Sequence, residues 1–261
     1  MCQNRTVDSN AQLFIGVSTK AYLGAAATTT WLEAARDAFD ARPELASLGI
    51  QPFVAPSSPM ITEARAILAG TSCWVGAQDG QWQTGAATGA VSMTMLAELG
   101  MDFVELGHAE RRRLFGEDDD EIRRKADAAS AAGLRVLLCI GEPDRTSAED
   151  AARRCLEQVL AVAARGGIPL DRLILAYEPW WAIGAESPAE PDYVNAVIRG
   201  VRAGLGTTLE GEVLGILYGG SAGPGTLAPL TEADGLFLGR FAHVPANFAR
   251  VLDDAIERRR N

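Results

Sequence analysis

Eight short apolar segments, rich in β-branched and aromatic residues, recur along almost the whole chain of 261 residues. Between them lie alanine-rich segments whose charged residues are spaced as in helices. Strands that are apolar throughout are typical of a parallel sheet covered by helices, so regular alternation of strand and helix predicts that architecture. The expected strands are Leu13–Val17, Ile50–Ala55, Cys73–Ala77, Phe103–Leu106, Arg135–Ile140, Leu173–Tyr177, Val213–Tyr218 and Leu236–Leu238.

Several helical segments have recognisable ends. Ser147, with Asp150 three residues later, resembles a capping box, and Gly133 stands where a terminating glycine is expected. About 33 residues per strand–helix unit fits an α/β fold of one domain, a closed (β/α)8 barrel over residues 1–261. A doubly wound open sheet is the alternative, but no G-x-G-x-x-G follows the first strand and no P-loop occurs. The expected helices are Thr30–Ala41, Ile61–Leu68, Ser92–Leu99, Asp118–Ala132, Ala148–Ala164, Asp192–Leu205 and Pro245–Ile256, with a further helix opening at Ala109–Arg113.

The chain is acidic, with 24 basic and 34 acidic residues and a net charge of −10. Its hydrophobic content of 48% is that of a folded globular protein. The negative charge disfavours nucleic acid and anionic membranes as partners, so a small anionic ligand would have to be held by local groups. Lys20 and Lys125 are the only lysines, and the other 22 basic residues are arginines.

Neither the start of the chain nor its cysteines indicate export or metal binding. Met1–Asn10 is polar and no segment has the length of a membrane span, so we expect a cytoplasmic protein. The cysteines lack CxxC or Cys–His spacing, so we expect no metal site, no disulfide framework and no cofactor. Reduced thiols that fill the core are expected at Cys2, Cys73, Cys139 and Cys155.

Three titratable residues follow expected strands, where the loops of a barrel converge on the functional site. Lys20 offers a compact ammonium in a chain that otherwise uses arginine, and a neutral His108 could polarise a carbonyl. Glu178 ends an apolar segment, which suits a general base. A surface lysine, a structural histidine and an ion pair at the rim are the alternatives.

Glycines follow the last two strands, in Tyr218-Gly219-Gly220-Ser221 and at Gly239. Backbone N–H groups of these two loops commonly hold phosphate in barrels, although turns also need glycine. A phosphate site built from neutral backbone would suit an acidic protein.

Two other charged or titratable residues look structural. Glu105 lies on the opposite parity from His108, so we expect it to face the helices beside an arginine partner. His243 is expected to be an ordinary surface residue.

A set of short motifs stands at or near the strand ends. They are Val75-Gly76-Ala77-Gln78, Leu106-Gly107-His108-Ala109-Glu110-Arg111-Arg112, Phe115-Gly116-Glu117, Cys139-Ile140-Gly141-Glu142, Ala176-Tyr177-Glu178-Pro179, Trp181-Ala182-Ile183-Gly184 and Tyr218-Gly219-Gly220-Ser221. In these motifs, their order and their spacing, from about residue 12 to 256, the chain resembles the triosephosphate isomerase family. The resemblance implies a TIM barrel and an aldose–ketose isomerase that acts on a small phosphorylated sugar.

The resemblance also implies roles for individual residues. Glu178 would remove a proton beside the substrate carbonyl, neutral His108 would hydrogen-bond the developing enediolate, and Lys20 would offset its negative charge. Phosphate binding is implied for Gly184, Ser221 and Gly239, and Tyr218 would latch a closed lid near Ala189. The mobile lid, which excludes water and protects the intermediate, would consist of Pro179, Trp180, Trp181, Ala182, Ile183, Gly184, Ala185, Glu186, Ser187, Pro188 and Ala189.

The chain departs from the family pattern within this site. Ser18 stands in place of an asparagine, Ala90 in place of a glutamate near the lysine, and Ala109 in place of a serine. These smaller side chains leave room for a larger or differently hydroxylated substrate. Arg240 stands in place of a glycine beside the phosphate, where it adds bulk but can also make a charge-assisted contact. Ser18 and Arg240 therefore join the expected substrate-binding residues.

The main functional hypothesis is the interconversion of dihydroxyacetone phosphate and glyceraldehyde 3-phosphate, a step of glycolysis and gluconeogenesis. An alternative is isomerisation of a four-carbon ketose phosphate, from erythrulose 1-phosphate to erythrulose 4-phosphate, on the same three residues. A second alternative is a sugar-phosphate-binding paralogue with little turnover. The intact Lys20, His108 and Glu178 disfavour that alternative, because a binding protein needs no base.

The resemblance further implies a homodimer. In the family the third loop projects into a neighbouring subunit, where its threonine, Thr88 here, supports that subunit's lysine. In this chain the segment from Gln78 to Gly85 is one residue shorter than expected, and Ala87 replaces an aromatic residue. Trp82 is a candidate interface anchor, with packing inside its own loop as the alternative. We expect a homodimer formed through the loop near Trp82 and Thr88.

Overall fold

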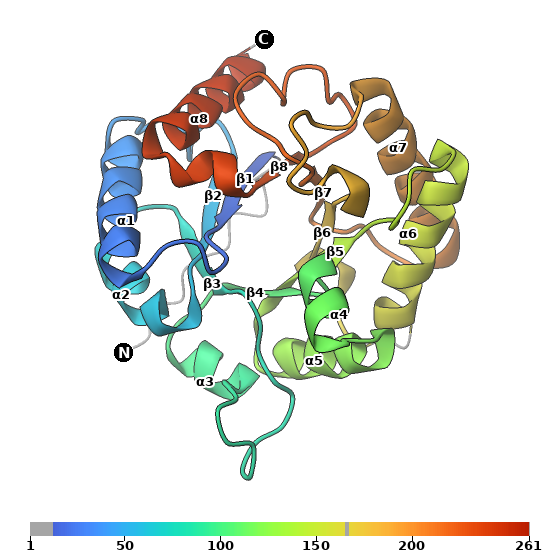
Figure 1. Cartoon of the computed structure of the whole chain (residues 1–261), viewed down its shortest axis with the longest axis horizontal. Coiled ribbons are helices and arrows are strands. Elements are labelled where there is room, and N and C mark those ends of the chain that lie inside the picture. The colour runs from blue at the N-terminus through green and yellow to red at the C-terminus, as the bar shows by residue number, and fades with distance from the viewer. Residues whose placement is uncertain (1–12, 165–166, 261) are drawn as a thin grey trace.

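The computed structural model describes residues 13–164 and 167–260, which form a closed barrel of parallel strands (Figure 1). Each strand pairs with its neighbours in chain order, and pairing of the last strand with the first closes the sheet. The predicted (β/α)8 barrel is therefore confirmed, with every strand within two residues of its expected bounds. The strands are β1 (Leu13–Ser18), β2 (Ile50–Ala55), β3 (Trp74–Ala77), β4 (Phe103–Leu106), β5 (Arg135–Ile140), β6 (Leu173–Tyr177), β7 (Gly215–Tyr218) and β8 (Gly235–Leu238).

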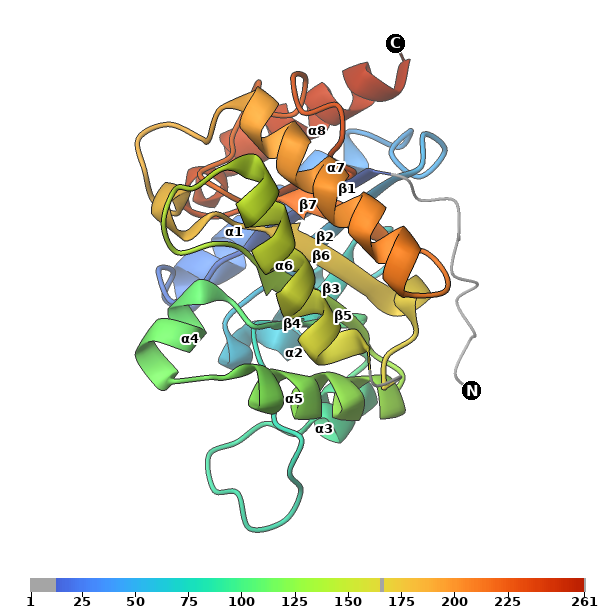
Figure 2. The same ribbon diagram turned by 90° about the vertical axis from the view of Figure 1, so that its right-hand side faces the viewer.

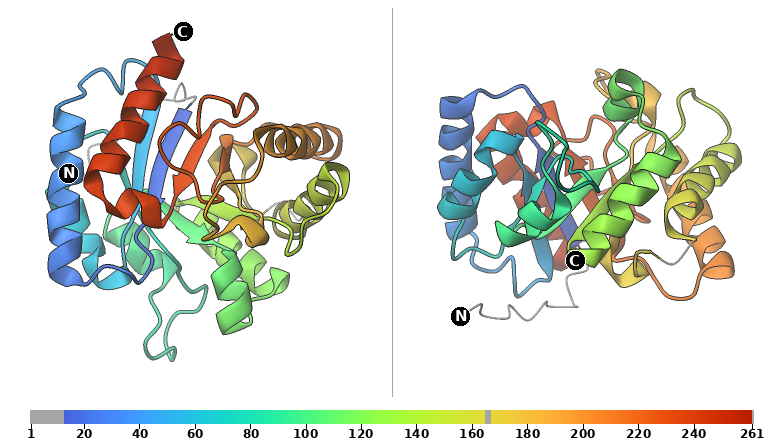
Figure 3. Two further views of the ribbon diagram at one scale, coloured as in Figure 1. Left: turned by 45° about the horizontal axis from the view of Figure 1, so that its top comes forward. Right: turned by 90° about the horizontal axis from the view of Figure 1, so that it is seen from below.

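Helices surround the barrel on its outside, as Figures 2 and 3 show from other directions. The α-helices are α1 (Ala25–Asp40), α2 (Ile61–Ile67), α3 (Met93–Glu98), α4 (Ala109–Phe115), α5 (Asp119–Ala131), α6 (Ala148–Ala163), α7 (Pro191–Thr208) and α8 (Pro245–Arg260). Short 3-10 helices are η1 (Ser58–Met60), η2 (Leu170–Arg172), η3 (Trp180–Ala182) and η4 (Arg240–His243). Within the described ranges no helix combines the length and apolar character that crossing a membrane requires. The expectations for Met1–Asn10 and Cys2 concern residues outside these ranges.

Helix α1 begins at Ala25, five residues before the predicted start at Thr30. Consecutive threonines lower helix propensity and obscure the start in the sequence. In the structure the Thr28 and Thr29 hydroxyls donate hydrogen bonds to the carbonyls of Gly24 and Ala25, at 2.9 and 3.2 Å. These hydroxyls therefore bond to the backbone of the first turn and are compatible with the helix.

The barrel interior is filled by inward-facing side chains of alternate strand positions. The rings of Phe53 and Phe103 pack edge to face at 5.3 Å, and Phe53 stacks on Phe237 at 5.8 Å. This aromatic layer fills the barrel below the C-terminal ends of the strands. The interior cluster comprises Phe14, Phe53, Ala55, Phe103, Leu137, Cys139, Ile174, Ala176, Leu217 and Phe237.

Outside the barrel, Lys125 on α5 is completely buried. Its ammonium donates to Asp79 at 2.9 Å and to Glu117, and Arg111 contacts the same two carboxylates at 2.9 and 2.6 Å. This charge cluster ties the start of the loop after β3 to α4 and α5. Cys73, Cys139 and Cys155 are buried, as expected for cysteines that fill the core.

Candidate active site

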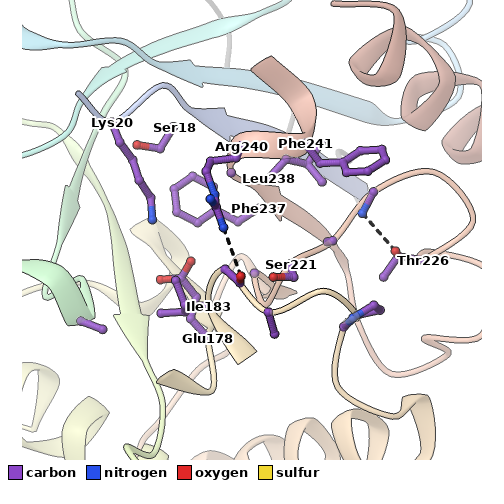
Figure 4. Close-up of a pocket in the computed structure, with 18 of the residues that line it drawn as sticks. Ser18, Lys20, Glu178, Ile183, Ser221, Thr226, Phe237, Leu238, Arg240 and Phe241 are labelled. Carbon is purple, nitrogen blue, oxygen red and sulfur yellow. Dashed lines mark hydrogen bonds between the residues drawn. The ribbon is translucent and has the colours of Figure 1, made fainter. Parts of the chain in front are cut away.

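A cavity of about 840 Å³ opens at the C-terminal ends of the strands (Figure 4). It is lined by the loops after β1, β6, β7 and β8 and by the start of α4. In Figure 4 Lys20 and Glu178 point toward each other, and Arg240 lies beside them with its guanidinium directed at the Gly184 carbonyl. The cavity brings together two of the expected catalytic residues, Lys20 and Glu178, with all five expected substrate-binding residues, Ser18, Gly184, Ser221, Gly239 and Arg240.

Lys20 is held in a sparsely populated backbone conformation, with φ of 47°. The Ser57 hydroxyl fixes that conformation by donating to the Lys20 carbonyl at 2.6 Å, and the Lys20 ammonium donates to Glu110 Oε1 at 2.9 Å. Burial alone would lower the pKa of the ammonium, but the charge of the Glu178 carboxylate and the hydrogen bond and charge of Glu110 outweigh it and raise the pKa. Lys20 therefore carries a positive charge inside the cavity near neutral pH.

His108 caps the N-terminus of α4 with its ring. The backbone N–H of Glu110 donates to His108 Nδ1 at 3.0 Å, so Nδ1 is an acceptor and the proton of the neutral ring lies on Nε2. Nε2 lies 3.3 Å from Glu178 Oε2. The positive φ of Gly107, 73°, turns the chain after β4 and places the ring there. The structure thus presents an N–H donor beside the proposed base.

Glu178 directly follows β6 and is 4% exposed. Its backbone N–H donates to the carbonyl of Ile140 at 2.8 Å, which continues the strand pairing and fixes its Cα. Gly219 leaves the space for its side chain, because a Cβ at that position would lie 2.6 Å from Glu178 Cγ. A side chain at 219 would displace the carboxylate from the cavity.

Three polar atoms of this site are buried without a hydrogen-bond partner among the described residues: Ser18 Oγ, His108 Nε2 and Glu178 Oε2. Burying such groups unsatisfied costs free energy, which a ligand that supplies the partners would recover. Together they present two hydroxyl or N–H donors and a carboxylate acceptor to one small volume. A polyhydroxylated carbonyl compound would satisfy all three.

The segment Pro179–Ala189, the expected lid, lies folded over the cavity. Its exit is held by Ala189, whose N–H donates to Tyr218 Oη at 2.8 Å, the pair that the latch hypothesis names. The Ser221 hydroxyl donates to the carbonyl of Ala182 at 2.8 Å. Residues 184–188 are exposed at its tip. These contacts describe a closed arrangement, while the lid's mobility stays a prediction.

The base of the lid is anchored by Glu142, whose importance sequence reasoning missed. Glu142 follows β5 and is completely buried, and its Oε1 accepts hydrogen bonds from Tyr177, Trp181 and Tyr193 at 3.2, 2.9 and 2.9 Å. The available signal was its place at a strand end, inside the motif Cys139-Ile140-Gly141-Glu142. A carboxylate with three donors can hold Trp181, and with it the start of the lid.

The opposite end of the cavity contains the residues expected to bind phosphate. Ser221 has φ of 51°, and it and Lys20 are the two non-glycine residues with positive φ in the part of the chain that the structure describes. Such backbone strain concentrates at functional sites. Arg240 is exposed at the rim, and its Nη2 donates to the Gly184 carbonyl at 3.1 Å, so it connects η4 to the lid.

Residues 13–255 match the family model of triosephosphate isomerase. The chain belongs to the triosephosphate isomerase family. The L-erythrulose-1-phosphate isomerase of Pectobacterium atrosepticum is 44% identical over 253 residues, covering 95% of this chain and 97% of that protein. The protein of the same name from Rhizobium etli is 41% identical, covering 78% and 79%. The triosephosphate isomerase of an Azoarcus strain is 38% identical, covering 74% and 82%.

Membership of the triosephosphate isomerase family identifies the chain as an isomerase and confirms the resemblance drawn from its motifs. Two departures from the family pattern lie at the reacting end of the cavity. Ser18 lines the cavity, and Ala109, 8% exposed, begins α4 directly after His108. Ala90 is exposed in the loop before α3.

The expectation for Glu105 was wrong. Glu105 does not face the helices: it follows Phe103 by two residues on β4 and pairs with Leu137, and both of these face the barrel interior. It is 3% exposed and has no ion pair with an arginine among residues 13–164 and 167–260. Parity counted back from His108 fails because Gly107, with its positive φ, interrupts the alternation.

His243 is also not an ordinary surface residue. It is half-buried at the end of η4, its ring lies 5.5 Å from that of Tyr22, and its Nε2 donates to the Ser18 carbonyl at 3.1 Å. Burial lowers the pKa of its imidazole, and the charges of Lys20 and Arg240 lower it further. A neutral His243 therefore connects η4 to the end of β1.

Proposed function

We propose that this enzyme isomerises L-erythrulose 1-phosphate to erythrulose 4-phosphate. The supporting observation is the combination of an intact Lys20, His108 and Glu178 with unsatisfied polar atoms and small side chains around the reacting carbons. The relative that matches nearly the whole chain carries that activity in its name. Such a substrate is a triose phosphate with one hydroxymethyl group added at the reacting carbon.

The first half of the reaction is proton removal. The Glu178 carboxylate takes the proton from C3, the hydroxyl-bearing carbon next to the C2 carbonyl, and the electron pair moves to the C2 oxygen. The resulting enediolate oxygen accepts the Nε2–H of His108, and the Lys20 ammonium stabilises its negative charge. The neutral ring suits this task, since its tautomer is fixed by the Glu110 N–H.

The second half returns the proton to the neighbouring carbon. Glu178 gives its proton to C2, and the hydroxyl proton on the C3 oxygen leaves through His108 while the C2 oxygen is protonated. The carbonyl then stands at C3, which is C2 of the product counted from its other end. No atom is gained or lost, and no oxidant is needed.

The closed lid and the strained loop after β7 would hold the phosphate away from the chemistry. Backbone N–H groups of Gly184, Ser221 and Gly239 would bind it, with Arg240 adding charge from the rim. Excluding water around the enediolate would protect it from losing phosphate. The lid hydrogen bond between Ala189 and Tyr218 supports this role.

Triosephosphate isomerisation is the second candidate. It is supported by the Azoarcus relative and by the same three residues, which act identically on a triose. The sugar-phosphate-binding alternative accounts less well for a buried carboxylate beside an N–H donor, because binding needs neither.

Steady-state kinetics with L-erythrulose 1-phosphate and dihydroxyacetone phosphate test the proposal. We expect kcat/KM to be higher for the tetrulose, and Glu178→Gln to lower both values by about 10³-fold or more through loss of the base. Glu257→Gln, an exposed carboxylate on α8, is the matched control and should leave both unchanged. A large preference for the triose would overturn the tetrulose proposal, and wild-type rates in Glu178→Gln would overturn both enzyme assignments.

We further propose a homodimer formed through the loop after β3. This loop projects away from the barrel in Figures 1 and 2, and Thr88 is exposed near its tip. Trp82 is half-buried and lies 5.8 Å from the Arg124 guanidinium of its own chain, which favours a role in positioning the loop. Apolar Leu114 and Phe115 on α4 are 65% and 67% exposed and would suit burial by a second copy.

A further inference from the structure

Glu105 is an acidic residue in a place that a hydrophobic side chain would fill without cost. On its strand it stands above Phe103, beside Leu137, with Cys139 on the next strand, all in the barrel interior. Its Oε2 is buried without a hydrogen-bond partner anywhere in the described chain. A buried carboxyl with one oxygen left unpartnered costs the fold free energy that an apolar side chain would not, so its presence calls for another explanation.

The surroundings of Glu105 are those of the active site. Its charge interacts with Glu178, Lys20 and Glu110, and the hydroxyl that influences it is that of Ser18. Ser18 faces inward at the end of β1 and lines the cavity, and its own Oγ is buried and unpartnered in the described structure. Two polar side chains, from β1 and β4, thus meet under the reacting end of the cavity, where Ser18 lines the cavity and Glu105 lies buried next to Ser18.

We propose that Glu105 and Ser18 form a polar floor that binds the terminal hydroxymethyl group of the four-carbon substrate, which makes Glu105 a specificity-determining residue. This inference rests on the proposed function. The tetrulose differs from the triose by a hydroxymethyl group on the carbon from which Glu178 takes the proton. That group must lie beside Glu178 and away from the phosphate, where the polar floor is.

The protonation state of Glu105 suits this contact. Burial, and next the negative charge of Glu178, raise its pKa to about 8, against the opposing effects of Lys20 and Ser18. At neutral pH it is a carboxylic acid that can donate one hydrogen bond and accept another. It adds no negative charge that would oppose deprotonation by Glu178. The other groups that face it are Glu110 on α4 and the neutral thiol of Cys139 on β5.

A site with buried polar groups discriminates strongly against a substrate that leaves them unpaired. The triose provides no atom for the floor, whereas the tetrulose provides one hydroxyl that can both donate and accept. The floor would therefore contribute to tetrulose selectivity, beyond the space left by Ser18 and Ala109.

The test combines a change in the enzyme with a change in the substrate. Wild type and Glu105→Val are assayed with L-erythrulose 1-phosphate and with its analogue lacking the terminal hydroxyl, 3-hydroxy-2-oxobutyl phosphate. We expect removal of the hydroxyl to lower kcat/KM at least tenfold in the wild type and less than threefold in Glu105→Val. If Glu105 were merely structural, removal of the hydroxyl would lower kcat/KM by the same factor in both enzymes. That result would overturn the inference.

Ser18→Ala provides a second variant if Glu105→Val does not fold, and it should show the same loss of sensitivity to the hydroxyl. Glu257→Gln again serves as the matched control and should keep the full wild-type sensitivity. Absence of L-erythrulose 1-phosphate turnover in the wild type would overturn the proposed function and this inference together. If L-erythrulose 1-phosphate is turned over but removal of its terminal hydroxyl lowers kcat/KM by the same factor in wild type and all variants, this inference alone would be overturned.

Discussion

At the scale of single residues, the two lysines occupy positions that arginine could not fill in the same way. Lys125 donates to carboxylates on different segments from a completely buried position, and Lys20 donates to Glu110 while facing Glu178. A compact ammonium can approach acceptors from several directions, whereas a guanidinium presents a planar fork. The rarity of lysine in an arginine-rich chain was therefore an informative sequence signal.

We expect Lys20→Arg to lower kcat/KM by about 10²-fold or more, because the larger, planar cation can neither keep the 2.9 Å contact with Glu110 nor occupy the same point in the cavity. The melting temperature should change by only a few degrees, since the side chain borders an open cavity. Arg250→Lys, an exposed cation on α8, is the control. If kcat/KM of Lys20→Arg lay within threefold of the wild-type value, a positive charge of either shape would suffice for catalysis.

Glu105 also makes a prediction about stability and pH. Its folded-state pKa of about 8 lies above the ordinary value of 4.5, so the folded state holds a proton that the unfolded state has released between these values. The protonated Glu105 therefore contributes fully to the free energy of unfolding below about pH 4.5. This contribution is lost as pH rises toward 8, by up to ~1.4 kcal/mol per pH unit. We expect the melting temperature of Glu105→Gln to fall less steeply than that of wild type from pH 5 to 8. If the melting temperatures of wild type and Glu105→Gln fell in parallel with pH, Glu105 would lie in a more solvated environment.

At the scale of elements, the strands were predictable because parallel strands buried on both faces are apolar along their whole length. The start of α1 was not, because Thr28 and Thr29 look unfavourable until their hydroxyls bond to the backbone. Strand ends led to Lys20 and Glu178, which line the cavity, and to His108, which lies 3.3 Å from Glu178, because position along the chain is enough to find such residues. The direction of Glu105 was not predictable by counting, because one glycine at positive φ reverses the parity after β4.

The closed lid is held at its exit by one hydrogen bond, which a single substitution can remove. Tyr218→Phe removes the acceptor of the 2.8 Å bond from Ala189 N–H, and such a bond is worth about 1 kcal/mol. We expect kcat/KM to fall by up to about tenfold and inorganic phosphate release per turnover to rise, because the enediolate is less protected. Both are measurable in one coupled assay.

Tyr193→Phe is the matched control for the lid experiment. It removes a 2.9 Å hydrogen bond to Glu142 Oε1, which still accepts from Tyr177 and Trp181. We expect it to have a smaller effect on both measured quantities. Equal phosphate release in Tyr218→Phe and wild type would argue against a latch.

At the scale of the whole molecule, the net charge of −10 coexists with a site for an anion. The cavity lining includes three cations, Lys20, Arg113 and Arg240, alongside three carboxylates, Glu110, Glu178 and Glu186. Local placement decides binding over a few ångströms, since solvent screens the distant surface charges. A net negative charge is therefore compatible with a site for a small phosphate ester.

We expect the whole molecule to be a homodimer in solution. Light scattering at micromolar concentration should give twice the chain mass of 27.7 kDa. Thr88→Arg places a long cation at the exposed tip of the projecting loop, so we expect it to reduce that mass toward one chain. Activity should fall with it, because the Lys20 of each chain would lose the support of its neighbour's loop. Thr207→Arg, exposed on α7, should leave both mass and activity unchanged, and a monomeric wild type would contradict the dimer altogether.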